Sequence, residues 1–489
     1  MKQNETGFQS YEDAQTFLHK AIDYEKLISY QYNSSTFSLD RMVKMLEYVG
    51  NPHKAFASIH ITGTKGKGST SIMMSTILER AGLRTGLFTS PHLIDLKERI
   101  QINHQNISEY DFTSILNELR QYIQHLLDTE PSTSPTFFEI LTAVAMLYFK
   151  KERVERAVLE VGLGGRLDST NVVIPEVSII TNVGFDHTAI LGNTLSSIAY
   201  EKAGIIKQGI PVVSAVESPE ALSVIEKTCK EKDARLYLLG RDIWILDFGL
   251  RNADLSLNPQ FQLPNSKSEI RSPKSERGLM CTIKTWRHTY PDIFLPVVGT
   301  HQAKNCALVL GALEIMREQG NISIDDETIR NALARVYCPA RIEVVGENPR
   351  IILDYAHTVD SMKFLRESLL ENFKFKRLIL LLGFSQDKDL DNILKEIVLI
   401  GDSIIVTRSK NPRAAPPEDL YQRIERLCGK QSEITDNTQD AVTAAKRMAS
   451  KEDLICITGS AYVAGEAMQA LSMSIAKQNS PATNKNNQI

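Results

Sequence analysis

The first part of the chain alternates short apolar runs with stretches of helical periodicity. The near-continuous apolar runs are "ASIHITG", "RAVLEVGLGG", "EVSIITNVG" and "GIPVVSAV". Runs of this kind are typical of strands that are buried on both faces of a parallel sheet. Helical patterns occupy residues 71–81, 111–127, 137–151 and 194–206. The repeated alternation of strand and helix predicts a doubly wound α/β layer.

A second alternation starts after the segment "LPVVGTHQ". It contains four further apolar runs, each followed by a helical pattern: "RIILDYAH", "RLILLLGF", "DSIIVTRS" and "DLICITGS". We therefore predict one domain over residues 1–298, a second over residues 299–475 and a disordered polar tail over residues 476–489. The segment 252–278 is rich in Asn, Pro, Ser and Lys, which indicates a surface loop or insertion.

Length, charge and cysteine usage narrow the class of protein. The chain has 489 residues, which favours two domains, and its formal net charge of -3 gives no general attraction to nucleic acid or acidic membranes. Its six cysteines are scattered without metal-ligand spacing, as is typical of a reducing cytosol. The polar N-terminus does not resemble a signal peptide, and no apolar run reaches membrane-spanning length. We expect a cytoplasmic monomer that binds small molecules and neither nucleic acid nor membrane.

The segment "HITGTKGKGST" at residues 60–70 places a glycine-rich, cationic turn between a predicted strand and a predicted helix. Such a turn directs backbone N–H groups and the positive helix end at one anion. Lys67 would reach the outer phosphates of a nucleotide, and Ser69 or Thr70 would offer a hydroxyl to Mg²⁺. The strict pattern G-x-x-x-x-G-K-[ST] fails, because Gly68 follows Lys67. The alternative is a surface turn with chance glycines. By itself the turn predicts a site for nucleotide phosphate and nothing more.

The short register G-x-x-G-K-G-S resembles the nucleotide loop of the Mur-ligase superfamily. Further motifs in the first half are "TSPHL", "ERIQINH", "TFFE", "LEVGLGGRLDSTN", "GFDHTAILG" and "EKAGIIK". The second half contains "GTHQAKNCALVL", "ARIEVV", "LDYAH", "GFSQDKD", "TRSKNPRAA" and "TGSAYVAGEA". Together, in this order and over residues 37–473, they resemble the folylpolyglutamate synthase/dihydrofolate synthase family.

The resemblance implies a fold and a reaction. The expected fold is an N-terminal P-loop ATPase-type parallel-sheet domain and a smaller Rossmann-like C-terminal α/β domain, with the active site in the cleft between them. The expected reaction joins L-glutamate to dihydropteroate, to the γ-carboxylate of (tetrahydro)folate, or to both, at the expense of ATP and by way of an acyl phosphate. Lys67 and Mg²⁺ would neutralise the phosphoryl group during its transfer. We favour a bifunctional enzyme, because "TFFE" and "RLDS" resemble the bifunctional bacterial type.

The resemblance also implies metal and catalytic residues. It places Mg²⁺ ligands at Ser90, Glu160 and His187, each near the end of a predicted strand. The structural alternative for Ser90 is a helix N-cap, and that for Glu160 is a buried strand carboxylate paired with a basic side chain. The alternative for His187 is a histidine with a purely structural role. Lys202 matches the position that the family carbamylates, and the carbamate would help to hold a second Mg²⁺. Because a carbamate forms only on a neutral amine, burial would favour it; the alternative is a helix-face lysine paired with a carboxylate. The catalytic residues would be Lys67, His187 and Lys202.

Two groups of residues match the family's pterin pocket. The flat ring of an aromatic residue suits a heterocycle, and carboxylates accept hydrogen bonds from its amino groups. The expected pocket residues are Thr136, Phe138, Glu139, Leu167, Asp168 and Ser169. The alternative for one of the neighbouring Phe137 and Phe138 is a place in the core. The segment "STFSLDRM" at residues 35–42 is expected to add another part of this pocket.

The nucleotide would contact the loop and the second half of the chain. The expected contacts are Thr64, Gly66, Lys67, Gly68, Ser69, Asn305, Arg341 and Asp354. Arg341 offers a guanidinium fork for phosphates, and Asn305 and Asp354 would position the nucleotide from across the cleft. The structural alternative for Asn305 is an amide on a helix surface, and that for Arg341 is an ion pair at the rim of the site. The alternative for Asp354 is an aspartate in a turn at the end of a strand. His357 lies close in sequence, whereas Lys388 and "TRSKNPR" are explained equally well by glutamate recognition and by a solvated surface.

Two departures from the family pattern keep a rival open. Lys65 stands where the family's loop normally has Asn, and "LDYAHTVDSM" departs from D-G-A-H-N-P at Thr358 and Val359. The latter segment is similar to the murein tripeptide ligases, which makes a UDP-muramoyl-peptide ligase the main alternative. Such ligases normally carry an extra domain before the loop, whereas only residues 1–59 precede it here. A non-catalytic nucleotide-binding switch is a third hypothesis, which predicts loss of the metal residues.

Overall fold

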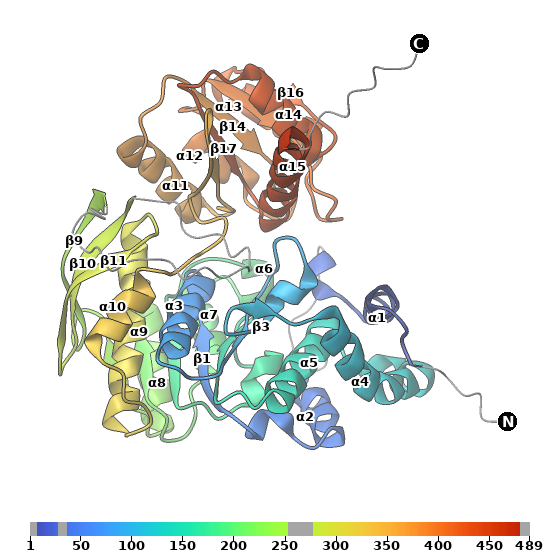
Figure 1. Ribbon diagram of the computed structural model, residues 1–489, viewed down its shortest axis with the longest axis vertical. Coiled ribbons are helices and arrows are strands. Elements are labelled where there is room, and N and C mark those ends of the chain that lie inside the picture. Colours follow the sequence, from blue (N-terminus) through green and yellow to red (C-terminus); the bar gives the residue numbers. More distant parts are fainter. Residues whose placement is uncertain (1–6, 28–36, 253–276, 480–489) are drawn as a thin grey trace, which may run out of the picture. The chain divides into compact units, whose positions relative to one another are not determined.

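The computed structural model describes residues 7–27, 37–252 and 277–479 (Figure 1). The chain forms two compact units. The first unit comprises Met1–His92 and Leu96–Cys338, and the second comprises Leu93–Asp95 and Pro339–Ile489. Among the described residues, no helix combines the length and the apolar character that crossing a membrane requires.

The first unit is built on an eight-stranded sheet with the strand order β4-β3-β2-β5-β1-β6-β7-β8. The central strand β1 (Ala57–Thr62) pairs in parallel with β5 (Arg156–Glu160) and β6 (Val177–Ile180). The other strands are β2 (Thr85–Phe88), β3 (Ile100–Ile102), β4 (Gln105–Asn106), β7 (Val212–Ser214) and β8 (Leu236–Leu238). All four apolar runs predicted in this part of the chain therefore form strands, and the parallel α/β layer is confirmed. Only the β3–β4 edge is antiparallel.

Helices cover both faces of this sheet. One face packs in a core with α3 (Lys67–Arg80), α9 (Thr300–Glu318) and α10 (Asp326–Leu333). The other face packs with α1 (Tyr11–Leu18), α2 (Leu39–Tyr48), α4 (Glu109–Thr129) and α5 (Phe137–Lys151). The remaining helical elements are η1 (Tyr24–Lys26), η2 (Pro52–Lys54), η3 (Leu96–Arg99), η4 (Pro131–Thr133), η5 (Ser169–Val172), α6 (Thr188–Leu191), α7 (Leu195–Ala203) and α8 (Pro219–Glu231).

The four predicted helices are all present, and three of them differ from the prediction at their ends. α3 begins at Lys67 instead of residue 71 and ends at Arg80 instead of residue 81. α5 has the predicted bounds, and α4 is slightly longer than predicted at both ends. α7 ends at Ala203 instead of residue 206. Its next residue, Gly204, lies so close to Arg166 that a Cβ atom there would overlap the arginine. The helix therefore ends where the turn at residues 162–171 packs closely against Gly204.

A small antiparallel sheet, with the order β11-β10-β9, completes the first unit. Its strands are β9 (Trp244–Asn252), β10 (Arg277–Lys284) and β11 (Thr289–Leu295). The predicted loop 252–278 overlaps the ends of β9 and β10, and residues 253–276 of it lie outside the described residues.

The boundary between the two units differs from the predicted one near residues 295–299. The units divide between Cys338 and Pro339, so α9 and α10 belong to the first unit. Figure 1 shows both helices, in yellow, beside α3. α9 is buried on nearly all sides, and a helix that is apolar all round belongs inside a core rather than at the start of a new domain.

The second unit contains a six-stranded sheet with the order β12-β13-β17-β14-β15-β16. Its strands are β12 (Glu343–Glu347), β13 (Arg350–Leu353), β14 (Leu378–Leu382), β15 (Ser403–Val406), β16 (Glu433–Ile434) and β17 (Leu454–Thr458). Its helices are α11 (Val359–Asn372), α12 (Leu390–Ile397), α13 (Pro417–Cys428), α14 (Thr438–Met448) and α15 (Ala461–Asn479). The four predicted runs form β13, β14, β15 and β17, and only β12 pairs antiparallel. The predicted tail begins inside α15, and residues 480–489 lie outside the described residues.

Candidate active site

The glycine-rich turn between β1 and α3, which we call the phosphate loop (residues 63–69), has a conformation that requires glycine at two positions. A Cβ atom on Gly63 would overlap Oγ1 of Thr181, and one on Gly66 would overlap Oδ1 of Asn305. Gly66 also has a φ of 84°, in the left-handed region that favours glycine. Gly68 has a Cβ position 3.7 Å from both carboxylate oxygens of Glu160, so the loop passes close to that carboxylate.

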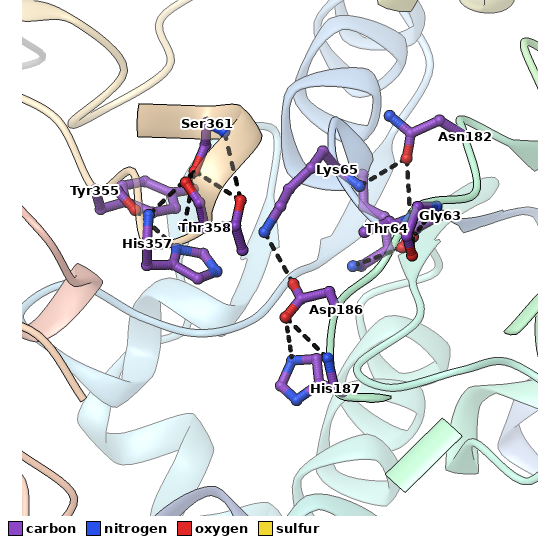
Figure 2. A network of polar contacts seen from close by, with 12 residues as sticks. Gly63, Thr64, Lys65, Asn182, Asp186, His187, Tyr355, His357, Thr358 and Ser361 are labelled. Carbon is purple, nitrogen blue, oxygen red and sulfur yellow. Dashed lines mark hydrogen bonds and ion pairs between the residues drawn. The ribbon is translucent and has the colours of Figure 1, made fainter. Parts of the chain in front are cut away.

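The phosphate loop is fastened to the segment that follows β6. Oδ1 of Asn182 accepts hydrogen bonds from the backbone N–H groups of Thr64 and Lys65, at 3.1 and 2.8 Å (Figure 2). The hydroxyl of Thr181 donates to the carbonyl of Lys65 at 2.6 Å. The hydroxyl of Thr64 donates to the carbonyl of Gly184 at 3.1 Å. The loop conformation is thus fixed by side chains from a neighbouring strand end.

The start of α3 has the polar groups of an anion site. Lys67 is its first residue, and its Nζ donates to the carbonyl of Gly63 at 3.0 Å. The hydroxyl of Ser69 lies 3.5 Å from Nε2 of Gln302. The hydroxyls of Thr70 and Ser71 are buried and lack a hydrogen-bond partner among the described residues. Buried hydroxyls are normally hydrogen-bonded, so the orphaned ones suit a ligand at this helix N-terminus.

Two of the three expected Mg²⁺ ligands lie together. The backbone N–H of Ser90 donates to Oε2 of Glu160 at 3.2 Å, and Glu160 is the buried last residue of β5. Among the described residues, no cluster of three or more His, Cys, Asp or Glu side chains has the arrangement of a metal site. The expected set contains only two such residues, because its third member is a serine. The metal-binding role of these residues stays a prediction.

His187 is joined to the phosphate loop through Asp186. The ammonium of Lys65 lies 2.9 Å from Oδ2 of Asp186, and Oδ1 of Asp186 accepts from the backbone N–H of His187 at 3.0 Å (Figure 2). Nε2 of His187 lies 3.8 Å from the same carboxylate. His187 has a φ of 51° and precedes α6. The carboxylate therefore orients the backbone of the residue that is expected to bind the metal.

Lys202 is buried in the last turn of α7, among other charged groups of the site. Burial lowers the pKa of Lys202 well below that of an ordinary lysine. The nearby ammonium groups of Lys67 and Lys65 lower this pKa further, and the carboxylate of Asp186 opposes them. A neutral amine at this position has the form that reacts with CO₂, so the structure suits the expected carbamate. Lys202 is therefore not a solvent-exposed lysine of α7, and its carbamylation stays a prediction.

The first group of expected pterin residues begins α5. Thr136 and Glu139 form a capping box, and Oε1 of Glu139 lies 2.8 Å from Nη2 of Arg41. Arg41 belongs to the segment "STFSLDRM", of which residues 35 and 36 lie outside the described residues. Phe137 is buried in the core, as the structural alternative predicted for one of the two aromatics. The ring of Phe138 is half-buried and would lie 2.7 Å from a Cβ atom on Gly162.

The second group surrounds the turn after β5. Oδ2 of Asp168 accepts from the N–H groups of Gly162 and Leu163, each at 3.0 Å. The hydroxyl of Ser169 lies 2.6 Å from that of Thr142 on α5, and Leu167 is half-buried. Burial raises the pKa of Asp168, against the effect of its hydrogen bonds. The structure thus connects the two groups through the Gly162 turn.

Asn305 lies on α9, in the same unit as the phosphate loop, and not in the second domain where we expected it. Its Oδ1 adjoins Gly66, and its Nδ2 donates to Oε1 of Gln302 at 3.0 Å. The correction follows from the later unit boundary. Asn305 therefore approaches the phosphate loop from within one core.

Arg341 and Asp354 lie in the second unit. The guanidinium of Arg341 stacks 3.7 Å from the ring centre of Tyr355. Asp354 accepts from the N–H groups of Ala356 and Ile342 at 2.6 and 3.1 Å, and burial raises its pKa while Arg341 opposes the rise. Nothing in the structure tests their expected contacts with ATP, which stay predictions.

The departure at Thr358 has a local explanation. Thr358 is the N-cap of α11, and its hydroxyl lies 2.9 Å from that of Ser361 (Figure 2). The backbone N–H of His357 also donates to Ser361, at 3.1 Å.

In the basic segment "TRSKNPR", Nε of Arg413 lies 3.2 Å from Oδ1 of Asp387. At least part of that charge is therefore used within the fold.

Sequence reasoning missed several residues that hold the site in shape. They are Asn182, Thr181, Asp186, Gln302 and His60. Thr181 and Asn182 follow the buried strand β6, at the edge where parallel sheets bind ligands, and this signal was available in "TNVG". Gln302 bonds to Asn305 within α9, whereas the hydrogen bonds of Asp186 to Lys65 and of His60 to Thr170 join distant segments.

Comparisons with known proteins agree with the resemblance. Residues 61–313 match the Mur ligase middle domain, and residues 340–461 match the Mur ligase, glutamate ligase domain. The dihydrofolate synthase/folylpolyglutamate synthase of Bacillus subtilis is 34% identical over 456 residues, which cover 93% of this chain and 97% of the relative. The folylpolyglutamate synthase of Lacticaseibacillus casei is 29% identical over 454 residues, 92% of this chain and 99% of the relative.

Solved structures resemble the whole fold. The ADP complex of Mycobacterium tuberculosis folylpolyglutamate synthase has a TM-score of 0.82 and 28% identity, and covers 94% of this chain and 98% of that one. The folylpolyglutamate synthase of Thermotoga maritima has a TM-score of 0.78 and 30% identity, and the match covers 95% of this chain and 97% of that one. On these matches, the chain belongs to the dihydrofolate synthase/folylpolyglutamate synthase family of Mur ligases.

Proposed function

We propose that this chain is an ATP-dependent ligase that joins L-glutamate both to dihydropteroate and to the γ-carboxylate of tetrahydrofolate. The observation that carries the proposal is the set of contacts in the first unit: a fixed phosphate loop, the Ser90–Glu160 contact and a buried Lys202 that is electrostatically coupled to Lys67. The B. subtilis relative, whose name includes both synthase activities, supports the bifunctional form.

Activation of the acid is the step for which the phosphate loop is suited. A carboxylate is a poor electrophile, so one of its oxygens attacks the γ-phosphorus of ATP, which releases ADP and gives an acyl phosphate. The amine of glutamate then attacks the acyl carbon, which releases phosphate and a proton and leaves an amide. The ammonium of Lys67 and the N–H groups at the start of α3 offset the negative charge that collects during phosphoryl transfer.

The oxygens of Ser90 and Glu160 suit Mg²⁺, which prefers oxygen ligands, and His187 would add a ring nitrogen. We propose that Ser90, Glu160 and His187 hold one ion, and that Lys202 as a carbamate helps to hold a second. When bound, Mg²⁺ supplies positive charge that offsets the charge of the phosphates. The buried amine of Lys202, with its lowered pKa, supports the modification.

The other substrates are assigned by the chemistry of their surroundings. The half-buried ring of Phe138 beside Gly162 supplies a flat face for a pterin. Arg341 and Asp354 are proposed to contact the nucleotide from the second unit, which matches a glutamate ligase domain. We also propose a cytoplasmic monomer, and the absence of a disulfide bond among the cysteines of the described residues supports a reducing compartment.

No separate observation favours the rival functions. The segment that resembles the murein tripeptide ligases departs from the family pattern at Thr358, which serves as the N-cap of α11. A non-catalytic switch predicted loss of the metal residues, whereas Ser90 and Glu160 are present and in contact.

The test is release of ADP with glutamate and, in parallel reactions, dihydropteroate, tetrahydrofolate or a UDP-muramoyl peptide. We expect turnover with the first two acids. Turnover with only one of the two would overturn bifunctionality, and turnover with the UDP-muramoyl peptide alone would overturn the folate assignment. Formation of the new amide is followed by mass spectrometry of the products.

A further inference from the structure

Asp168 is the centre of a hydrogen-bond network below the proposed pterin pocket. Its Oδ2 accepts from the N–H groups of Gly162 and Leu163, and its Oδ1 accepts from the N–H of Thr170 at 3.0 Å and from the Thr170 hydroxyl at 2.5 Å. Both oxygens are therefore held by the protein. The orientation of this carboxylate sets the shape of the turn after β5.

The turn that Asp168 holds in shape adjoins two parts of the proposed site, the expected Mg²⁺ ligand Glu160 and the ring of Phe138. Glu160, an expected Mg²⁺ ligand, is two residues before Gly162, and the ring of Phe138 packs directly on Gly162. Any rotation of the Asp168 carboxylate would release two N–H groups of the turn. The face of the pocket next to Phe138 would then lose its fixed position.

A histidine from the central strand holds the other end of this network. Nε2 of His60 lies 2.8 Å from Oγ1 of Thr170. Because the single hydroxyl proton of Thr170 is donated to Asp168, the hydrogen bond to Thr170 requires an N–H on Nε2 of His60. The order of donation is therefore His60 to Thr170 to Asp168.

His60 is suited to a fixed role of this kind. It is fully buried on β1, and burial lowers its pKa to about 3, so its ring is neutral near neutral pH. Its strand neighbours Ile59 and Ile61 point into the core shared with α3, whereas the His60 ring points to η5 on the opposite face. Its Nδ1 has no hydrogen-bond partner among the described residues. Burial of a histidine side chain with a single hydrogen-bond partner lowers the stability of the fold. This cost indicates that the hydrogen bond to Thr170 has a role at this position.

We infer that His60 is a positioning residue for the pterin substrate: through Thr170 it fixes the Asp168 carboxylate, and through Asp168 it fixes the turn against Phe138. The inference rests on the proposed function, because it requires a pterin at this turn. It assigns His60 no contact with substrate and no part in proton transfer.

The test compares two pairs of variants. His60→Leu removes the donor and His60→Gln supplies one, while Thr170→Val removes the hydroxyl and Thr170→Ser keeps it. Ile61→Val is the matched control, because it alters the same strand on its other face. Binding of dihydropteroate and of ADP is measured by calorimetry, and folding is checked by thermal unfolding.

We expect the Kd for dihydropteroate to rise about tenfold in His60→Leu and in Thr170→Val. It stays within about threefold of the wild type in the two conservative variants and in Ile61→Val, and the Kd for ADP changes less than about twofold in all five. The double variant His60→Leu/Thr170→Val is no weaker than either single one, because both break one network.

Three results would overturn the inference. One is unchanged dihydropteroate binding in both His60→Leu and Thr170→Val. The second is an equal loss of ADP binding, which indicates general damage to the fold. The third is additive effects in the double variant. If His60→Leu fails to fold, the Thr170 pair decides alone. A wild-type protein that binds ADP but not dihydropteroate would contradict the proposed function itself, and the inference would fall with it.

Discussion

The ammonium of Lys65 lies 2.9 Å from the carboxylate of Asp186, and this pair joins the phosphate loop to the residue before His187. Lys65 is the position at which the loop departs from the usual Asn of the family. Its backbone is already held by Asn182 and Thr181. The lysine side chain therefore adds a positive charge and a contact with Asp186 to the backbone contacts of the loop.

Replacement of Lys65 by Met should weaken nucleotide binding. The variant loses a positive charge beside the proposed phosphate site, and Lys65 no longer offsets the negative charge of Asp186 there. We expect the Kd for ADP in the absence of Mg²⁺ to rise about three- to tenfold, as measured by calorimetry. Lys97→Met is the matched control, since it breaks an ion pair with Glu109 on a different part of the first unit. Unchanged ADP binding in Lys65→Met would refute the role given to this lysine.

Lys67→Ala should abolish formation of the acyl phosphate. Its ammonium belongs to the first residue of α3, and loss of such a charge from a phosphoryl-transfer site costs about a thousandfold or more in kcat. The circular dichroism spectrum should stay that of the wild type, because the Lys67 amine contacts only the Gly63 carbonyl among the hydrogen bonds described. Full activity in this variant would contradict the mechanism.

The buried amine of Lys202 should make stability depend on pH. Its pKa is lowered in the folded state, so over the interval between that pKa and the ordinary lysine value the unfolded chain binds the extra proton. The unmodified protein therefore gains stability as pH rises through this interval and loses it as pH falls through the folded pKa. Lys202→Met, which cannot be protonated, should remove that slope. Urea unfolding in CO₂-free buffer at several pH values measures it, and equal slopes in the two proteins would contradict burial of a neutral amine.

The same amine should take up CO₂. We expect native mass spectrometry to find one added CO₂ on the wild type in bicarbonate buffer, and none on Lys202→Met. Lys207→Met is the control for other lysines, because Lys207 is also partly buried and burial lowers its pKa to about 8. An added CO₂ that persists in Lys202→Met would place the modification elsewhere.

Glu139 should matter for stability through two separate contacts. Glu139→Gln keeps an oxygen for the capping box of α5 but loses the charge that pairs with Arg41. Glu139→Ala loses both. Because the pair is largely buried, we expect the free energy of unfolding to fall by about 2–4 kcal/mol in Glu139→Gln and by about 1 kcal/mol more in Glu139→Ala. Urea denaturation checks both values, and equal losses would show that the cap contributes nothing.

The sequence allowed part of the elements to be predicted, because an apolar run or a helical period is encoded locally. The predictions did not include the short strands β2, β3, β4 and β8 or the sheet of β9, β10 and β11. Apolar runs gave the parallel strands, and α5 was predicted with its actual bounds. The unit boundary was placed too early because α9 follows a strand and resembles the start of a new alternation. What decides its unit is packing against α3, which the periodicity of a single helix does not reveal.

The site was predictable only in part. Motif positions correctly pointed to Ser90 and Glu160 as neighbours, although they lie 70 residues apart in sequence. The residues that hold the site in shape could not be predicted from motif positions. The bond between His60 and Thr170 spans 110 residues, and no local sequence pattern links the two positions. Asn305 was assigned to the wrong unit for the same reason, since its contact with Gly66 depends on how α9 packs.

The two faces of β1 have a practical consequence for engineering. Ile59 and Ile61 lie in the core on one side and His60 on the other, and the strand leads into Gly63. Larger replacements on β1 would disturb either the core packing of Ile59 and Ile61 or the hydrogen bond from His60 to Thr170, so β1 is a poor place to seek a more heat-resistant variant. Peripheral helices such as α8 and α13, whose outer faces meet solvent, offer the better starting points for consensus or surface-charge substitutions.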